Sequence, residues 1–290
     1  MRVHLLTLLT ALSFIQAYGQ YGKPDTKEMN LRSRVRMIIE TDFKPTVANN
    51  QIVSEKRGRS KRYLFNELGY KLTLTMNYET GLPYMMYTYT YESSDKKRLK
   101  EYKAYEYNNN GKQFLYDRSE YKYHRSADSG NPIVRITENQ YDKDNKFYSQ
   151  KGYKLNRMGL PTRIETLRTT LSSSRFMSTY KYDERGNQTE YIYYNSAGKR
   201  TNYRKYQYSS KNRLIKSLDY NRNGTLSSFY TVSYNTKGDI ITKKFFDSSD
   251  VVYRTESYTY KYDTKGNWTR RIKSIDGKPT EIHSRTIEYY

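Results

Sequence analysis

The sequence predicts an all-β protein, a long antiparallel β-meander of tyrosine-rich repeats whose sheet is twisted and partly single-layered. Two observations lead to this fold class. Turn-forming residues recur about every 13 residues through the second half of the chain, which is the spacing of consecutive antiparallel strands. The 290 residues also include 35 Tyr but only 9 Phe and 1 Trp. Tyrosine combines an apolar ring with a polar tip, and it therefore suits strands that have water near both faces.

Residues 1–19 have the pattern of a secretory signal peptide. Arg2 supplies a positive start, residues 5–15 are mostly apolar, and Ala17 and Gly19 provide the small residues of a cleavage site. We therefore expect cleavage near Gly19 and a mature protein that is secreted, either to the periplasm or to the cell surface. The chain contains no Cys, and a secreted chain without disulfides is typical of bacteria. We expect no transmembrane segment in the mature chain.

Residues 20–62 do not contain the repeat, and we expect them to form an N-terminal cap segment and a basic linker. Residues 34–41 predict a first, capping strand, because terminal units of repeat arrays are atypical. Residues 54–62 contain five Lys or Arg residues, which indicates a flexible linker.

The repeat domain is expected to cover residues 63–290. Residues 180–187 (YKYDERGN) and 260–267 (YKYDTKGN) are nearly identical, and looser copies occupy 206–213 and 232–239. In three of the four copies an Asp or Asn can bond the backbone two residues on, and a Gly supplies the positive φ of a type I turn with a following bulge; the copy at 206–213 has Ser209 and Asn212 at these positions. In Tyr-x-Tyr both rings point to one face of the strand. Weaker copies extend back to residue 63 and predict on the order of sixteen strands.

At these residues the sequence resembles the YD-repeat, or RHS, family. Residues 182–187 (YDERGN) and 262–267 (YDTKGN) match the Y-D-x-x-G-N core of that family. The resemblance covers most of residues 63–290 and is strongest in the C-terminal part. It implies a β-sheet repeat protein exported or displayed by bacteria, of the small secreted Gram-negative type. The repeat of this family carries no catalytic residues that could be assigned here.

Neither face of the predicted strands is continuously apolar. In the strand after Gly238, for example, one face carries Lys243 and the other carries Lys244. A sandwich requires one dry face on each strand, so we favour a sheet that is partly single-layered. A transmembrane β-barrel is the competing interpretation, but Lys216, Lys244 and Arg270 interrupt the apolar band that a lipid-facing wall needs.

The chain shows no motif for catalysis or metal binding. His124 and His283, the two histidines of the mature chain, have no nucleophile or ligand motif beside them, and turn formation accounts for Asp183 and Asp263. We therefore predict a protein that is not an enzyme and has no metal or other cofactor. The alternative is an envelope hydrolase or a toxin-associated protein. It would require a cavity with paired acids, or one of these histidines with a partner.

The charge suggests what the protein binds. The chain has 52 Lys and Arg against 30 Asp and Glu, a formal net charge of +22. Rows of basic residues and Tyr favour a non-enzymatic binding role at the bacterial cell envelope, with a protein or an anionic polysaccharide as partner. Nucleic acid uses similar residues, but a secreted protein rarely meets it, so we do not expect it. Part of the charge also keeps a long sheet soluble. The candidate binding residues are the repeat tyrosines and their neighbouring lysines: Tyr180, Lys181, Tyr182, Lys205, Tyr206, Tyr208, Tyr260, Lys261 and Tyr262.

Overall fold

A computed structural model describes residues 24–93, 97–126, 133–170 and 176–290. The predicted signal peptide lies outside the described residues. A short helix precedes a series of strands that follow one another along the chain. The elements are α2 (Asp25–Glu28), β1 (Val35–Ala48), β2 (Gln51–Phe65), β3 (Lys71–Asn77), β4 (Pro83–Tyr91), β5 (Leu99–Tyr107), β6 (Gln113–Arg125), β7 (Ile133–Asp142), β8 (Phe147–Leu155), β9 (Pro161–Thr169), β10 (Met177–Tyr182), β11 (Gln188–Tyr194), β12 (Arg200–Tyr208), β13 (Leu214–Tyr220), β14 (Leu226–Tyr234), β15 (Ile240–Asp247), β16 (Val252–Tyr262), β17 (Trp268–Ile275) and β18 (Lys278–Tyr289).

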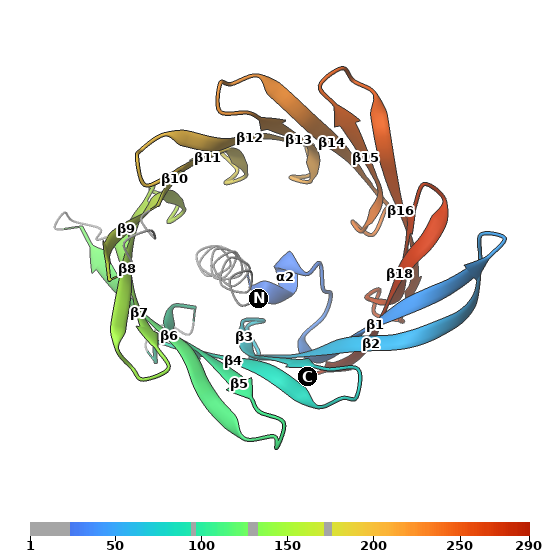
Figure 1. The fold of residues 1–290 in the computed structure, drawn as a ribbon, viewed down its shortest axis with the longest axis horizontal. Helices are drawn as coiled ribbons and strands as arrows, with labels where there is room; N and C mark the ends of the chain where they lie inside the picture. The colour runs from blue at the N-terminus through green and yellow to red at the C-terminus, as the bar shows by residue number, and fades with distance from the viewer. Residues whose placement is uncertain (1–23, 94–96, 127–132, 171–175) are drawn as a thin grey trace.

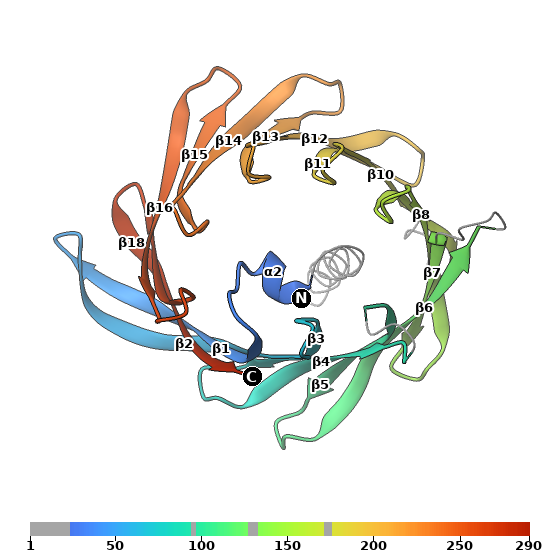
Figure 2. The same ribbon diagram turned by 180° about the vertical axis from the view of Figure 1, so that it is seen from behind.

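The strands form one antiparallel sheet that closes into a barrel (Figures 1 and 2). Each strand pairs with the next along the chain, and β1 pairs with both β2 and β18. The all-β meander is therefore confirmed, whereas the open twisted sheet is wrong, because the sheet has no free edge along this ring. Nearly every pairing contains a register shift, for example between Lys181 and Tyr182. Such bulges increase the local twist that closure of a sheet requires.

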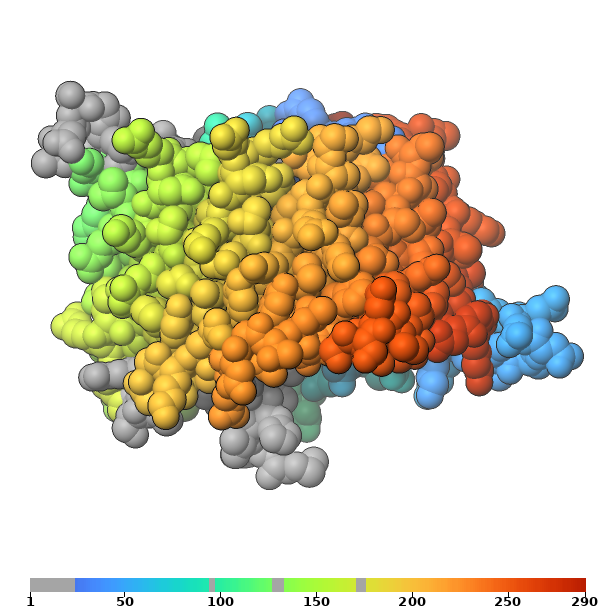
Figure 3. All heavy atoms as spheres, turned by 90° about the horizontal axis from the view of Figure 1, so that it is seen from above, coloured from blue at the N-terminus to red at the C-terminus, as the bar shows by residue number. Residues whose placement is uncertain are grey.

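The N-terminal part of the barrel corrects a second expectation. Residues 54–62, predicted to be a flexible linker, belong to β2, and the domain boundary predicted at residue 63 falls inside that strand. The pairing of β1 with β18 ends at Phe43, and the pairing of β2 with β3 ends at Ser60. Residues 44–59 therefore form a two-stranded tip, which projects from the barrel in blue in Figure 3. The basic residues of β2 can form a strand here because the backbone of β1 pairs with that of β2 along the tip.

The repeat turns lie together at one end of the barrel and have the predicted geometry. In the copy at 183–187, Asp183 Oδ1 accepts hydrogen bonds from the backbone N–H groups of Arg185 and Asn187 at 3.0 and 2.8 Å, and Gly186 has a φ of +80°. The segment after α2 lies inside the ring at this end (Figure 1). There Arg32 donates to the Lys237 carbonyl at 2.7 Å and accepts from Asn267 at 2.8 Å.

The pairing register assigns each side chain to the inner or the outer wall. Asp25, on α2 inside the ring, pairs with Lys71 at 3.1 Å, and the Lys71 ammonium lies 5.3 Å from the centre of the Tyr89 ring, so Tyr89 faces inward. Residues paired across neighbouring strands point to the same face of the sheet, and side chains alternate along each strand. Starting from Tyr89, the pairings therefore identify the inward-facing residues of every strand around the barrel. The main apolar cluster lies on this wall, from β3 to β10: Leu74, Met85, Tyr87, Tyr89, Leu99, Tyr102, Ala104, Tyr121, Ile136, Tyr153, Leu155, Ile164 and Tyr180.

The outer wall carries charges at the middle of its strands. The pairing register places Lys216, Lys244 and Arg270 on this wall. These are the residues that, in the sequence, interrupt the apolar band of a lipid-facing wall. Lys103 and Arg118 lie opposite each other on it, and both form ion pairs with Glu101. Among the described residues, the helices are too short to span a membrane.

Candidate functional site

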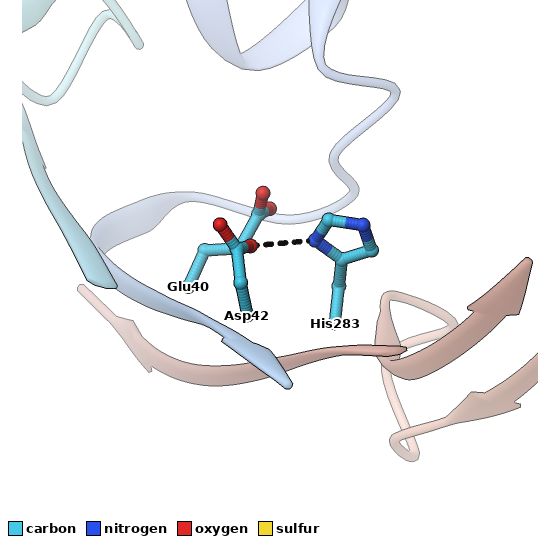
Figure 4. A group of neighbouring side chains, drawn as sticks. All are labelled: Glu40, Asp42 and His283. Carbon is cyan, nitrogen blue, oxygen red and sulfur yellow. Dashed lines mark hydrogen bonds and ion pairs between the residues drawn. The ribbon is translucent and has the colours of Figure 1, made fainter. Parts of the chain in front are cut away.

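The first and last strands bring together on the inner wall three side chains of types that can bind a metal ion. In the pairing of β1 with β18, Asp42 lies directly opposite His283, and Glu40 lies opposite Arg285. Glu40 and Asp42 are two residues apart in one strand, so both point to the same side, as Figure 4 shows. One ligand atom from each of Glu40, Asp42 and His283 lies within 4.8 Å of the other two. We call these three residues the seam triad.

The seam triad is held by short polar contacts. His283 Nδ1 and Asp42 Oδ1 are 2.7 Å apart (Figure 4), and Arg285 Nε donates to Glu40 Oε2 at 2.7 Å. Burial acts to raise the pKa of Asp42, but the hydrogen bond and charge of His283, with the charges of Lys61 and Arg271, outweigh it and lower that pKa. The other ring nitrogen, His283 Nε2, is buried without a hydrogen bond to any described residue and lies 3.5 Å from Glu281 Oε2.

A group of cations adjoins the seam triad on the inner wall of β15 to β18. We call it the basic cluster, and it consists of Lys243, Arg254, Arg271, Lys273 and Arg285. The register places Lys243 opposite Glu256, and Arg271 opposite both Tyr260 and His283. Glu256 pairs with Arg254 at 3.2 Å and with Lys273 at 3.4 Å. Arg271 forms no ion pair with a described residue, so cations outnumber acids in this part of the wall.

The basic cluster contains hydrogen-bond donors that the described part of the chain does not satisfy. Arg254 Nε, Arg271 Nε and Arg285 Nη1 are buried without a hydrogen-bond partner among the described residues. A buried donor without a partner costs about 1–3 kcal/mol. Burial also lowers the pKa of Lys243; the charge of Glu256 opposes this, while the neighbouring cations Lys273, Arg271 and Arg254 lower that pKa further. A bound anion would relieve both the missing hydrogen bonds and the repulsion.

Aromatic rings contact the basic cluster, and side chains beside it are exposed to solvent. Two guanidinium groups contact the Trp268 ring, with Arg285 Cζ 3.5 Å and Arg271 Cζ 5.1 Å from its centre. Such cation–π contacts fix the guanidinium planes. The side chains of Arg254 and Glu281 are 41% and 50% exposed although both face inward. The inner wall is therefore accessible to solvent beside the cluster.

The structure divides the predicted binding residues between the two walls. The six tyrosines face inward and the three lysines face outward, because they alternate along the strands. The hydroxyls of Tyr182, Tyr208 and Tyr260 donate to the carbonyl groups of Pro161, Gln188 and Ile240 on the preceding strand, at 2.7–2.8 Å. These hydroxyls join neighbouring strands. None of the predicted binding residues belongs to the basic cluster, although Tyr260 lies opposite Arg271. This cluster was not predicted from the sequence.

The structure also bears on the hydrolase alternative. His283 has the acidic partner that this alternative requires, but its hydrogen-bond and ion-pair partners among the described residues are the acids Asp42 and Glu281 and include no hydroxyl nucleophile. His124 contacts Thr137 at 3.0 Å on the outer wall. A pocket of about 640 Å³ lies at the other end of the barrel from the repeat turns. Its lining contains one carboxylate and no histidine: Arg59, Tyr78, Glu79, Thr80, Leu82, Pro83, Tyr107, Asn108, Asn109, Asn110 and Gly111.

The fold and these contacts define an up-and-down β-barrel whose inner wall is apolar from β3 to β10 and basic from β15 to β18. No protein-family model and no curated protein matches the chain. Among solved structures, the chain is similar to a porin-like protein from Bacteroides uniformis ATCC 8492, with 14% identity and a TM-score of 0.46 over 89% of this chain and 98% of that one. It is also similar to a porin-like protein from Bacteroides vulgatus ATCC 8482, with 13% identity and a TM-score of 0.35 over 64% of this chain and 91% of that one. Similarities at this level assign neither a family nor a function.

Proposed function

We propose that the protein is a non-enzymatic binding module of the bacterial cell envelope that binds an anionic polysaccharide at the inner wall of its barrel. The observation that carries the proposal is the set of buried, unpartnered guanidinium donors on Arg254, Arg271 and Arg285. Oxyanions are the natural partners of such donors, since guanidinium groups bind carboxylates and sulfates through paired hydrogen bonds.

Two further features support a sugar polymer rather than a small anion. Rings of Tyr258, Tyr260 and Trp268 lie beside the cations, with Tyr260 and Trp268 6.3 Å apart and Arg271 6.0 Å from Tyr258. Aromatic faces stack on sugar rings while cations bind their acidic groups. The cations also continue over four strands, from Lys243 on β15 to Arg285 on β18, and a repeating ligand can meet several of them at once.

The test uses the single Trp of the chain as a reporter, because Trp268 touches the basic cluster. We expect the fluorescence of the mature protein to change on titration with polygalacturonate but not with neutral dextran. The apparent affinity should fall as salt rises, since part of the binding is electrostatic. Arg271→Gln should weaken binding roughly tenfold or more, the effect of losing one charge-assisted hydrogen bond.

A matched pair of lysine variants separates a site from general attraction to a basic protein. Lys243→Gln removes a charge from the inner wall, and Lys205→Gln removes the same charge from the outer wall. Weaker binding in the first variant alone supports the proposal. An equal loss in both, or equal binding of dextran, would contradict it.

A further inference from the structure

We propose that Glu40, Asp42 and His283 bind a divalent transition-metal ion, with Zn²⁺ as the expected occupant. The inference does not depend on the polysaccharide proposal. The three residues offer one imidazole nitrogen and two carboxylate oxygens from adjacent strands, with all three ligand atoms within 4.8 Å of one another. A mixed nitrogen and oxygen set suits Zn²⁺, whereas Ca²⁺ and Mg²⁺ prefer oxygen ligands alone.

The spacing of the Asp42 and His283 ligand atoms is close to what the ion requires, and the ligand atom of Glu40 lies within 4.8 Å of both. Zn²⁺ binds N and O ligands at about 2.0–2.2 Å, so in a tetrahedral site the ligand atoms lie about 3.3 Å apart. Asp42 Oδ1 and His283 Nδ1 are 2.7 Å apart, a distance at which they share a proton. An ion would replace that proton after the two side chains separate by roughly 0.6 Å. The 42% exposed side chain of Asp42 has the freedom to make this movement.

The surrounding residues supply an outer shell of the kind that metal sites use. Arg285 occupies only Oε2 of Glu40, at 2.7 Å, and leaves the second oxygen for an ion. His283 would bind the ion through Nδ1, which leaves Nε2 facing Glu281 Oε2 at 3.5 Å. A carboxylate behind the ligating imidazole fixes the orientation of the ring and raises its basicity. The orphaned state of Nε2 is relieved once metal binding at Nδ1 makes Nε2 the protonated nitrogen.

Nearby cations act against the ion and limit its affinity. Arg285, Lys61 and Arg271 are the basic side chains that act on these acids. Two carboxylates and a neutral imidazole still bring two negative charges to a divalent ion. With three protein ligands, a fourth position remains open to water or to an anionic group.

The test uses the mature protein without a histidine tag, freed of metal by a chelator. We expect Zn²⁺ to raise its melting temperature by about 5 °C or more at saturation. Co²⁺ should bind with a stoichiometry of one and give the visible absorption bands of a low-symmetry nitrogen and oxygen site. Both effects should disappear in Asp42→Asn and in His283→Gln.

The control is His124→Gln, which removes the other described histidine, on the outer wall, and should leave both effects unchanged. Retention of the Co²⁺ bands in Asp42→Asn and His283→Gln, or their loss in His124→Gln, would overturn the proposal. No Co²⁺ band in the unaltered protein would show that the seam triad is an ion-pair network only. Circular dichroism of each variant identifies any loss that comes from unfolding, in which case the double variant Glu40→Gln with Arg285→Met, which leaves no unpaired buried charge, replaces it. Polygalacturonate binding is measured separately, so either proposal can fail alone.

Discussion

The guanidinium carbon of Arg285 lies 3.5 Å from the centre of the Trp268 ring. The same guanidinium pairs with Glu40 through Nε, and its side chain is only 7% exposed. One arginine thus joins the first strand, the last strand and the single Trp of the chain. We therefore expect the fluorescence of that Trp to change when the pairing of β1 with β18 is lost.

Arg285→Met should destabilise the protein by about 3–5 kcal/mol, because it leaves the largely buried Glu40 carboxylate without its partner. The double variant Arg285→Met with Glu40→Gln should recover much of this loss, since no unpaired charge remains. Urea unfolding followed by circular dichroism measures both. A double variant as unstable as the single one would show that packing of the arginine on Trp268 is the larger contribution.

Asp117 should make stability fall as pH rises from about 4 to about 6. Burial raises the pKa of Asp117 to about 6, with the charge of Glu138 acting in the same direction and the Tyr148 hydrogen bond opposing it. The folded state therefore binds a proton in this window that the unfolded chain has released, so stability is greatest below the unfolded pKa. The loss across the window is up to about 3 kcal/mol.

Asp117→Asn isolates this contribution, because it keeps an acceptor for Tyr148, which donates to Asp117 at 3.2 Å. Urea midpoints at pH 4 to 7 should fall less steeply with pH in the variant than in the unaltered protein. The comparison is needed because the pKa values of Asp42 and Glu256 are lowered in the folded state. These two groups make stability rise with pH, opposite to the effect of Asp117. Parallel pH profiles for the two proteins would contradict the prediction.

Tyr208→Phe should cost about 0.5–1.5 kcal/mol, the net value of one hydrogen bond. Its hydroxyl donates to the Gln188 carbonyl at 2.8 Å, and phenylalanine keeps the ring in place. Tyr253→Phe is the matched control, since Tyr253 is 58% exposed. Thermal unfolding of both variants decides the point, and an equal effect would mean that the inter-strand bond adds nothing.

Gly186→Val should destabilise the repeat turn by more than Gly186→Asn. Gly186 has a φ of +80°, a conformation that costs a β-branched residue much more than Asn. The equivalent turn at residues 209–212 already uses Asn212 at a φ of +58°. Melting temperatures of the two variants should therefore rank Asn above Val, and the reverse order would be inconsistent with the turn geometry.

Local features of the fold could be predicted from the sequence, because they depend on neighbouring residues. Asp183 and Gly186 set their own turn, and the alternation of Tyr180, Lys181 and Tyr182 decides which wall each faces. Closure could not be predicted, because it depends on the number and twist of the strands and not on any one segment. Residues 54–62 were mistaken for a linker because their charge, taken alone, resembles that of a flexible segment.

The candidate site was missed for the same reason. His283 and Asp42 are 241 positions apart, and neither has a motif around it. Only the pairing of β1 with β18 makes them neighbours. The sequence contains one signal for the site. Glu40 and Asp42 are two residues apart, as are His283 and Arg285, the spacing that places two side chains on one face of a strand. The Tyr-rich repeats, by contrast, place their hydroxyls in contacts between strands.

The pairing of β1 with β18 also has a kinetic consequence. Its two partners lie about as far apart in the chain as any two strands can, so a fully flexible chain would lose roughly 5 kcal/mol of entropy on bringing them together first. The other hairpins close over short turns and can form early. We therefore expect an open, curved intermediate to precede the closed barrel, with the edges of β1 and β18 exposed to other chains. The slow final step, rather than the repeats, would then decide how much of the protein folds and how much aggregates.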